Sequence, residues 1–373
     1  MSVPLDQLVA AYSRQAPLAE AWTIPASWYT DSRVLDLETR STFARSWQPA
    51  ARIEQLESPG RYVTCRLPSG DPVAIVRGQD GVLRGFFNVC RHHAAEVVTA
   101  PEGAAASLRC PYHGWTYGLD GTLKGTPDFA GVCNFDRAEQ GLVPVATGVW
   151  EGWVFVRAEP AGSSLDEYLG RQLALQIAQL DLQRFRWMER RHYTLACNWK
   201  VFVDNYLDGG YHVPHLHKGL DSVLDYSRYA IEIGERFCLQ SSPIVTGGAD
   251  RATGAVRQGA RACYYWIYPN FMINVYGNAM DTNLVLPRGA DRTEVVFDFY
   301  FAEVSDASRA RNQASIEVSE IIQQEDVAIC ESVQRGLGSR AYTAGRLSVR
   351  REAGEHLFHQ LLYDDLMWGL SRT

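Results

Sequence analysis

The chain has 373 residues, which is enough for two domains of ordinary size. Hydrophobic residues make up 46% of it and charged residues 21%, as is typical of globular proteins, and the lack of any run of about 18 apolar residues predicts that it does not span a membrane. The net charge is −7 and the sequence has no long basic run, so nucleic acid is not an expected partner.

The N-terminus and the cysteine pattern indicate a cytoplasmic protein. Residues Met1–Gln15 lack the basic region and apolar core of a secretory signal. Two of the eight cysteines belong to a motif described below, and the other six are scattered singly, as expected for buried free thiols in a reducing compartment. These six are Cys65, Cys133, Cys197, Cys238, Cys263 and Cys330.

Residues 1–44 are expected to be mainly helical and to pack on the catalytic domain that follows later in the chain. Asp31 is a candidate helix N-cap, and Val34, Leu37 and Phe43 mark a partly apolar face behind it.

Residues 45–157 are expected to form a small all-β domain, an antiparallel sandwich. Turn signals such as Pro68–Asp71 separate short runs of apolar and β-branched residues. The predicted strands are Arg61–Leu67, Pro72–Arg77, Leu83–Val89 and Val149–Val156, with a further hairpin around Trp115–Thr122.

Two pairs of metal-ligating residues lie in this β domain. Cys90 and His92 form the first pair, and Cys110 and His113 form the second. Two thiolates and two imidazoles can hold one tetrahedral zinc ion, or a [2Fe–2S] cluster with two Cys on one iron and two His on the other.

The spacing of these residues favours the cluster over zinc. Zinc sites usually pair Cys with Cys and His with His, whereas each pair here mixes the two types and the first has a single intervening residue. Pro111 and Gly114 supply tight-turn chemistry in the second loop, and the rings of Trp115 and Tyr117 could cover a cluster against water.

Residues 158–373 are expected to form an α+β domain with an antiparallel sheet flanked by helices. Ser164 ends a linker and is a candidate N-cap. The expected elements are a helix from Ser164 to about Leu182, a strand at Arg191–Leu195, a helix from Val201, strand-like residues in Tyr264–Tyr276 and Thr293–Phe301, and a long helix Arg309–Gln334 ended by Gly336.

A second cluster of ligating residues lies between Asp204 and His217, and includes Asp208, His212 and His215. On a regular helix, His212 and His217 would point about 140° apart. Pro214 disturbs a helix, however, so both imidazoles could turn toward one point. Because non-haem Fe(II) oxygenases bind iron through two His and one carboxylate, the pattern indicates an iron site that still needs an acid.

Asp326 is the best candidate for that acid. It is the one charged member of an apolar stripe on the long helix, and a buried lone carboxylate is costly unless it is paired or bound to a metal. Glu325 is the rival, on a more mixed face. The other members of the stripe are Val318, Ile322, Ile329 and Val333.

The alternative is a structural role for these groups. The histidines would then be polar residues at a helix end, and Asp326 would be a buried salt-bridge partner. Of the three histidines, His215 is expected to face substrate or support the ligands rather than to bind metal.

With these motifs in place, the chain resembles the alpha subunits of the Rieske non-haem iron oxygenases over nearly its whole length. Within that family it is similar to the choline monooxygenases and related quaternary-ammonium oxygenases. The motifs that carry the resemblance are Cys90-x-His92…Cys110-Pro-Tyr-His113-Gly-Trp, Asp204–Pro214, His217–Leu220, Tyr268–Asn274 and Met280–Asn283. The resemblance implies an α+β fold in which an all-β Rieske [2Fe–2S] domain is inserted in a helix-grip-like catalytic domain.

The resemblance also implies the cofactors and partners. A separate NAD(P)H-dependent reductase, with or without a ferredoxin, would supply electrons, and this chain has no G-x-G-x-x-G motif of its own. In a homotrimer, the cluster of one subunit would face the iron of the next. The implied ligands are Cys90, His92, Cys110 and His113 for the cluster, and His212, His217 and Asp326 for mononuclear Fe(II).

The family usually carries an acid three residues before the first iron-binding His, where it bridges ligand histidines of both metal sites. In this chain that position is Gly209. Asp208 or Asp204 would then serve as the bridging acid, and the sequence leaves both open.

The expected reaction inserts oxygen from O2 into a C–H bond of a small molecule, in first place a quaternary ammonium compound. Such a cation cannot be hydrogen-bonded, so an aromatic cage is the expected receptor, although aromatic residues in strands are usually core. Alternation places Tyr264 and Trp266 on one strand face and Tyr265 on the other, so not all of the aromatics can line one pocket. The aromatic candidates are Tyr206, Tyr211, Tyr264, Tyr265, Trp266, Tyr268, Phe271 and Tyr276. His215 and Asn274 are further candidates for substrate contact.

Three alternatives stay open. The first is a Rieske oxygenase for an aromatic acid or another amine, which would need an Arg or Lys in the pocket for the acid. The second is a pure electron carrier, which the ligand set of the C-terminal half disfavours. The third is a zinc-stabilised binding protein.

Overall fold

The structure, a computed structural model, describes residues 3–245 and 250–372. It divides into two compact units, one made of residues 43–168 and the other of residues 1–42 together with 169–373. The sequence-based boundaries fall after residues 44 and 157, so the structural unit takes in the following linker and the start of a helix as well.

The unit of residues 43–168 is built from short strands around two apolar clusters. One cluster contains Val63, Ile75 and Val154, and the other surrounds the buried Cys90 and Cys110. Its larger sheet has the order β1 (Gln48–Arg52), β10 (Trp153–Arg157), β9 (Pro144–Trp150), β4 (Leu83–Phe87), β3 (Pro72–Arg77), β2 (Arg61–Arg66) and β5 (Glu102–Ala104). A small sheet consists of β6 (Leu108–Arg109), β7 (Thr116–Tyr117) and β8 (Leu123–Gly125).

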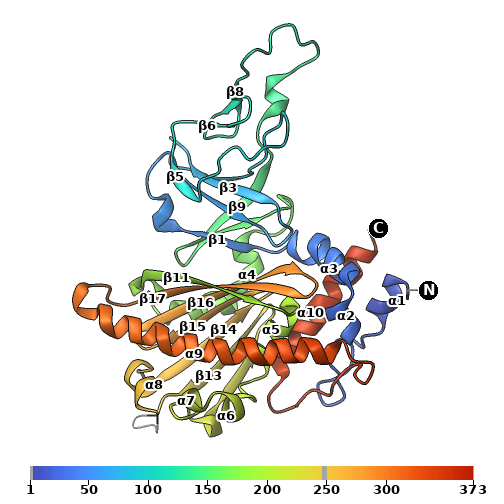
Figure 1. The fold of residues 1–373 in the computed structure, drawn as a ribbon, viewed down its shortest axis with the longest axis vertical. Helices are drawn as coiled ribbons and strands as arrows, with labels where there is room; N and C mark the ends of the chain where they lie inside the picture. The colour runs from blue at the N-terminus through green and yellow to red at the C-terminus, as the bar shows by residue number, and fades with distance from the viewer. Residues whose placement is uncertain (1–2, 246–249, 373) are drawn as a thin grey trace. The chain divides into compact units, whose positions relative to one another are not determined.

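The other unit contains a seven-stranded sheet in which every neighbouring pair is antiparallel. Its order is β11 (Arg186–Leu195), β17 (Arg292–Phe301), β16 (Ala279–Gly289), β15 (Phe271–Tyr276), β14 (Arg261–Ile267), β13 (Phe237–Pro243) and β12 (Ala230–Ile233). The long helix α9 (Asp306–Leu337) crosses one face of this sheet (Figure 1). The predicted α+β class is therefore confirmed.

The other helices are mostly short. Among the described residues, no helix combines the length and the apolar character that a membrane crossing requires. The N-terminal helices α1 (Leu5–Ala10), α2 (Ala26–Thr30) and α3 (Ser32–Glu38) belong to the same unit as the large sheet. The remaining helices are α4 (Leu165–Ala178), α5 (Trp199–Leu207), α6 (Val213–Leu216), α7 (Lys218–Asp221), α8 (Arg251–Val256) and α10 (Ala353–Leu370).

The two predicted helix N-caps are confirmed, but the helices predicted from Val201 and Arg309 start earlier, at Trp199 and Asp306, and two predicted ends are wrong. Asp31 accepts a hydrogen bond from the backbone of Arg33 at the start of α3, and Ser164 caps α4. Helix α4 ends at Ala178 rather than near Leu182. Helix α9 continues through Gly336, because an interior glycine costs a helix only about 1 kcal/mol and does not by itself end it.

The buried face of α9 also differs from the predicted apolar stripe. Ile329 and Val333 are 37% and 44% exposed. The helix instead buries small and polar side chains, among them Asn312, Ser319 and Gln323. The prediction holds for Val318, which is buried, and for Ile322 and Asp326, which line a cavity, and it is wrong for the last two members of the stripe.

Candidate active site

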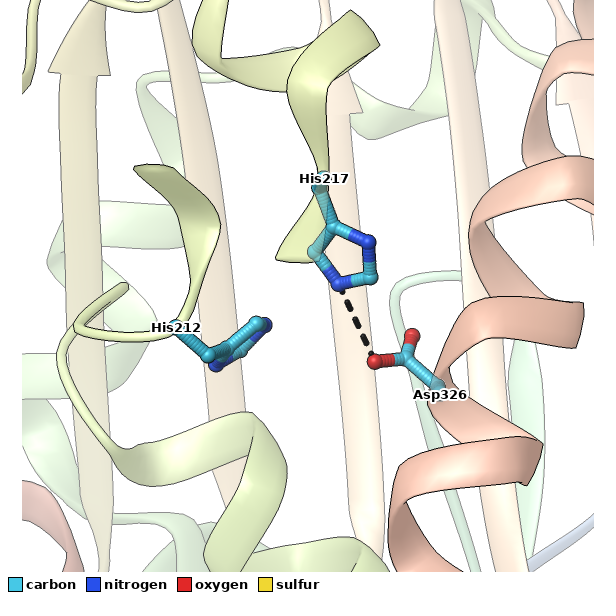
Figure 2. Close-up of side chains that lie close together, drawn as sticks. All are labelled: His212, His217 and Asp326. Atoms are coloured by element: carbon cyan, nitrogen blue, oxygen red, sulfur yellow. Dashed lines mark hydrogen bonds and ion pairs between the residues drawn. The ribbon is translucent and has the colours of Figure 1, made fainter. Parts of the chain in front are cut away.

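Two histidines and one aspartate meet beside the large sheet. His212 precedes α6, His217 follows it, and Asp326 lies on α9 (Figure 2). One potential ligand atom from each of the three lies within 4.8 Å of the other two. The Nε2 atom of His217 is 3.1 Å from Oδ1 of Asp326, and the imidazole rings of the two histidines are 4.8 Å apart.

A carboxylate contacts the Nδ1 atom of each imidazole, which leaves Nε2 for a metal. Nδ1 of His212 is 2.6 Å from Oδ2 of Asp208, and Nδ1 of His217 is 2.7 Å from Oε2 of Glu325. A histidine that binds metal through one nitrogen commonly donates the other to a carboxylate, which fixes the orientation of the ring. The set therefore has the donor atoms and the supporting acids of a two-His, one-carboxylate iron site.

The break that turns the two histidines together lies at His217 and not at Pro214. Pro214 is in the first turn of α6, where its missing N–H costs little, and His217 has non-helical backbone angles between α6 and α7. The sequence-based reason for the convergence was therefore wrong, although the rings do converge.

The geometry explains why the acid beside His212 is at position 208. Gly209 has a φ of +69°, and a Cβ atom there would overlap the backbone oxygen of Arg351. An acidic side chain three residues before His212 is thus excluded. Asp208 instead ends α5 and accepts hydrogen bonds from the backbone N–H groups of Tyr211 and His212.

Asp204 does not contact the triad and belongs to a separate buried group of polar side chains. Its carboxylate accepts a hydrogen bond from the Tyr29 hydroxyl at 2.6 Å and lies 3.0 Å from Nε2 of His359. Glu355 completes this buried group, and burial followed by the charge of Asp204 raises the pKa of Glu355 well above its ordinary value. Of the two candidate bridging acids, only Asp208 contacts a histidine of the triad in the described structure.

Asn205 is a residue that the sequence analysis missed. Its side-chain amide donates to Oδ1 of Asp326 at 2.9 Å, so it helps to fix that carboxylate. Burial lowers the pKa of His217, but hydrogen bonds to Asp326 and Glu325 outweigh it and raise the pKa overall. These acids therefore give the site a strongly anionic character that suits a divalent cation.

A cavity with about 770 Å³ of atom-free space, part of it open to solvent, adjoins the triad. His212, His217 and Asp326 line it. Much of the remaining wall is aromatic, from Phe202, Tyr206, Tyr229, Tyr264, Tyr276 and Phe297.

One wall of the cavity carries a buried carboxylate. Asp281, on β16, is 4% exposed, and its Oδ1 accepts hydrogen bonds from the side chains of Asn274 and Asn283. Its Oδ2 has no hydrogen-bond partner among the described residues. Burial raises the pKa of Asp281, while the charge of Arg257 and the two amides act against this rise.

Of the ten sequence-predicted substrate residues, four line the cavity. They are Tyr206, Tyr264, Asn274 and Tyr276, and Tyr206 and Asn274 are joined by a 2.7 Å hydrogen bond. The other six, which include the buried Phe271, lie outside its lining. Tyr211 and His215 are exposed, Tyr265 faces Phe237, Trp266 packs on Phe358 of α10, and Tyr268 donates to Asp365.

Tyr264 shares a strand face with Trp266, as alternation predicts, but only Tyr264 reaches the cavity because α10 covers Trp266. Tyr229, Arg257 and Asp281 also line the cavity, and none of them was predicted to do so from the sequence. Asp281 is the one acidic residue of β16, which could have signalled it, whereas nothing in the local pattern marks Arg257.

In the β unit, the two Cys–His loops share one backbone design. In each loop, the cysteine N–H donates to the carbonyl five residues later, and the N–H four residues later donates back to the cysteine carbonyl. The four bonds are Cys90–Ala95 (2.8 Å), Ala94–Cys90 (3.0 Å), Cys110–Trp115 (2.8 Å) and Gly114–Cys110 (3.1 Å). Ala94 and Gly114 both have positive φ, at 59° and 73°.

The ligating side chains of these loops suit a cluster with a buried thiolate end and an exposed imidazole end. Cys90 and Cys110 are buried, His92 is half-buried and His113 is exposed. The two imidazole rings lie 4.7 Å apart, and the Nδ1 atom of His92 is buried without a hydrogen-bond partner among the described residues. The Tyr117 hydroxyl lies 3.3 Å from the sulfur of Cys90. The loops therefore fit two irons, one held by Cys and one by His.

Two family models match the chain. The model of the Rieske [2Fe-2S] domain matches residues 46–136, and the model of the ring hydroxylating alpha subunit (catalytic domain) matches residues 182–367. The first range contains both Cys–His loops, and the second contains the His–His–Asp triad.

Individual relatives agree with these matches. The chloroplastic choline monooxygenase of Arabidopsis thaliana is 39% identical over 97% of this chain and 87% of its own length. The carnitine monooxygenase oxygenase subunit of Escherichia coli (strain K12) is 31% identical over 92% of this chain and 93% of its own length. A solved quaternary ammonium Rieske monooxygenase in complex with L-carnitine is 30% identical, with a TM-score of 0.80 over 92% of this chain and 96% of that one.

The chain therefore belongs to the alpha subunits of the Rieske non-haem iron oxygenases, and the resemblance seen in the sequence is confirmed. It is a Rieske [2Fe–2S] oxidoreductase of the choline monooxygenase-like type, with a catalytic domain of the class that carries a mononuclear iron.

Proposed function

We propose that this oxygenase hydroxylates a C–H bond of a small quaternary ammonium compound. The reaction uses O2, two electrons and two protons and yields the hydroxylated substrate and water. A separate NAD(P)H-dependent reductase, with or without a ferredoxin, supplies the electrons, and a homotrimer brings the cluster of one subunit to the iron of the next. The relatives named for choline and carnitine oxidation support this proposal.

The observation that carries the substrate class is the combination of tyrosine rings and the Asp281 carboxylate beside the triad. A quaternary ammonium has no N–H to donate, so it is bound by aromatic faces and by an anion. Tyr206, Tyr229 and Tyr264 supply the faces, and Oδ2 of Asp281 supplies an unpaired negative charge. A neutral substrate would leave that buried charge compensated only by two amides and by the more distant Arg257, which is costly.

We assign the iron to the His–His–Asp triad and the [2Fe–2S] cluster to the two Cys–His loops. When bound, mononuclear Fe(II) activates O2 for insertion into a C–H bond, and the [2Fe–2S] cluster relays electrons one at a time. His212, His217 and Asp326 hold the iron, while Asp208 and Glu325 orient the two imidazoles. Cys90, His92, Cys110 and His113 hold the cluster.

Asp208 is also the proposed bridging acid. Its carboxylate is hydrogen-bonded to Nδ1 of His212 and is held in place by backbone N–H groups of the Asp208–His212 turn. Asp204 is instead committed to Tyr29 and His359. The carboxylate of Asp208 can accept a hydrogen bond from an imidazole of each metal site and so connect the two sites for electron transfer.

Aerobic turnover tests the substrate class. The iron- and cluster-loaded enzyme, supplied with electrons by a reductase, is incubated with choline, glycine betaine, L-carnitine and benzoate, and O2 uptake and product are measured. Oxidation of at least one of the three quaternary ammonium compounds and not of benzoate is expected. Preference for benzoate would support an aromatic-acid oxygenase, and a colourless protein with zinc and no acid-labile sulfide would contradict the whole proposal.

The Asp281→Asn variant tests whether the ammonium group of the substrate binds in this cavity. It removes the negative charge and keeps the shape, so the KM for the ammonium substrate should rise by roughly tenfold or more, as expected when a buried charge loses its partner. The matched control is Asp291→Asn, in the exposed turn between β16 and β17, and it should leave KM unchanged.

A further inference from the structure

Arg257 is a buried cation in the cavity without a carboxylate partner. It follows the last turn of α8, is 4% exposed and lines the cavity beside Tyr276. Its guanidinium donates to the hydroxyls of Ser319 (2.6 Å) and Ser315 (3.2 Å) and lies 4.2 Å from the centre of the Tyr276 ring. In the described chain no carboxylate lies within 4.0 Å of it, and its Nε has no hydrogen-bond partner. Hydroxyls stabilise a guanidinium but do not neutralise it, so the buried charge is incompletely compensated.

The wall around Arg257 offers further hydrogen-bond donors. Gln323 lies one helical turn after Ser319 on α9, so both side chains are on the same face of the helix. Gln323 is 2% exposed and lines the cavity, and its Nε2 also has no partner. A guanidinium and an amide with unused N–H groups form the kind of site that accepts a carboxylate.

The same cavity holds the opposite charge on Asp281. The two groups are too far apart for an ion pair, yet close enough for the charge of Arg257 to lower the pKa of Asp281 against the effect of burial. A plain cation would compensate Asp281 and leave Arg257 facing a like charge. A plain anion would compensate Arg257 and leave Asp281 unpaired. A ligand with both charges compensates both groups.

We infer that the substrate is a zwitterion, a quaternary ammonium compound that also carries a carboxylate, and that Arg257 is the specificity-determining residue that pairs with this carboxylate. The inference rests on the proposed function, because Asp281 and the tyrosines bind the ammonium end. It separates betaine-type substrates from choline, which has a hydroxyl in place of the carboxylate.

Choline and glycine betaine form a matched pair for the test, since they share the trimethylammonium group and differ in CH2OH against COO−. L-Carnitine adds a longer spacing between the charges. We would measure kcat/KM for each compound, and also its Kd by calorimetry on the iron-loaded enzyme without an electron donor, so that binding is seen without turnover. The variants are Arg257→Gln and Arg257→Lys. The control is Arg261→Gln, an exposed arginine that also donates to a serine but lies outside the cavity lining.

The wild-type enzyme should prefer at least one zwitterion to choline. Arg257→Gln should lower kcat/KM and affinity for that zwitterion by roughly 30-fold or more, as truncation of a buried charge pair does, and should leave choline unchanged or improved. Arg257→Lys should restore part of the preference, and Arg261→Gln should match the wild type. Because each variant is judged by its ratio between two ligands, a general loss of stability cannot imitate the result.

A preference for choline that Arg257→Gln does not alter would overturn the inference and leave the quaternary ammonium proposal standing. If none of the three compounds binds or reacts, both proposals fail. Oxidation of benzoate that depends on Arg257 would show that the cavity takes a plain acid, and would overturn the zwitterion.

Discussion

The two ligand sets of this chain are built in different ways. Each Cys–His pair lies in one short loop, and the two loops repeat the same backbone hydrogen bonds and the same positive φ. The His–His–Asp set joins a broken helix at residues 212–217 to a helix more than a hundred residues later. Ligands held in one short loop can be recognised in the sequence by their spacing. Ligands that tertiary packing brings together can be recognised only by their residue types.

The supporting residues differ in the same way. Around the cysteines, support comes from the loop backbone and from Tyr117 on the neighbouring strand β7. Around the triad it comes from side chains of two helices, with Asp208 ending α5, Asn205 within α5 and Glu325 on α9. The second site should therefore be the more sensitive to single side-chain changes outside the ligands.

Asp326→Ala should have the largest effect at the triad. Removal of the carboxylate leaves two imidazoles for the metal, so mononuclear iron and turnover should both be lost while the visible absorption of the cluster stays intact. Iron analysis, the visible spectrum and O2 uptake measure the three quantities. Glu317→Ala, an exposed acid on the same helix, is the control. Undiminished turnover in Asp326→Ala would refute its role as a ligand.

Cys110→Ala should have the opposite effect on the two metal centres, with loss of the cluster and retention of the iron site. The variant loses a thiolate of the cluster, so the visible chromophore and turnover should vanish, while the triad keeps its affinity for Fe(II). Calorimetric titration with Fe(II) under anaerobic conditions checks the second point. Cys133→Ala, at an exposed cysteine of the same unit, should keep its colour. Retention of the chromophore in Cys110→Ala would contradict the cluster assignment.

Asp208→Asn and Asp204→Asn separate the two candidate bridging acids. The asparagine at 208 keeps the turn but weakens the grip on Nδ1 of His212, so iron affinity and electron transfer to the iron should fall by about 10- to 100-fold. Single-turnover kinetics from the reduced cluster measure the transfer. Asp204→Asn should leave this rate near that of the wild type. The opposite order would move the bridge to Asp204.

The smallest effect at neutral pH is the titration of Asp281. Burial raises its pKa, so the carboxyl stays neutral to a higher pH than an ordinary aspartate. The attraction for an ammonium is complete above that pKa and is lost as the pH falls through it, at up to about tenfold per pH unit. Arg257 is the charged group that opposes the shift, and Asn274 and Asn283 are the neutral neighbours. Calorimetry with glycine betaine from neutral to acid pH should show the loss, and Asp281→Asn should flatten the profile.

Much of the fold followed from pattern. Short alternating runs between turn signals predicted β2, β3 and β4, and caps such as Asp31 and Ser164 marked helix starts, because these signals act over a few residues. The predicted strand Val149–Val156 was wrong, because a turn at Glu151–Gly152 divides it between β9 and β10. Helix ends were less certain, as Gly336 shows, since a helix held by packing tolerates a glycine. The predicted buried face of α9 is right at Val318 and wrong at Ile329 and Val333, because what the helix packs against is decided elsewhere in the chain.

The sequence by itself determined the family, the two Cys–His pairs and the His–His–Asp candidates, because spacing and residue type already restrict the metal chemistry. Only the tertiary structure decided which acid grips His212, since the space beside Gly209 is taken by the backbone of Arg351. It also decided that Asp281 and Arg257, which lie on different elements, face one cavity. Charged residues that are distant in sequence can bind one ligand together only because the fold places them around the same cavity.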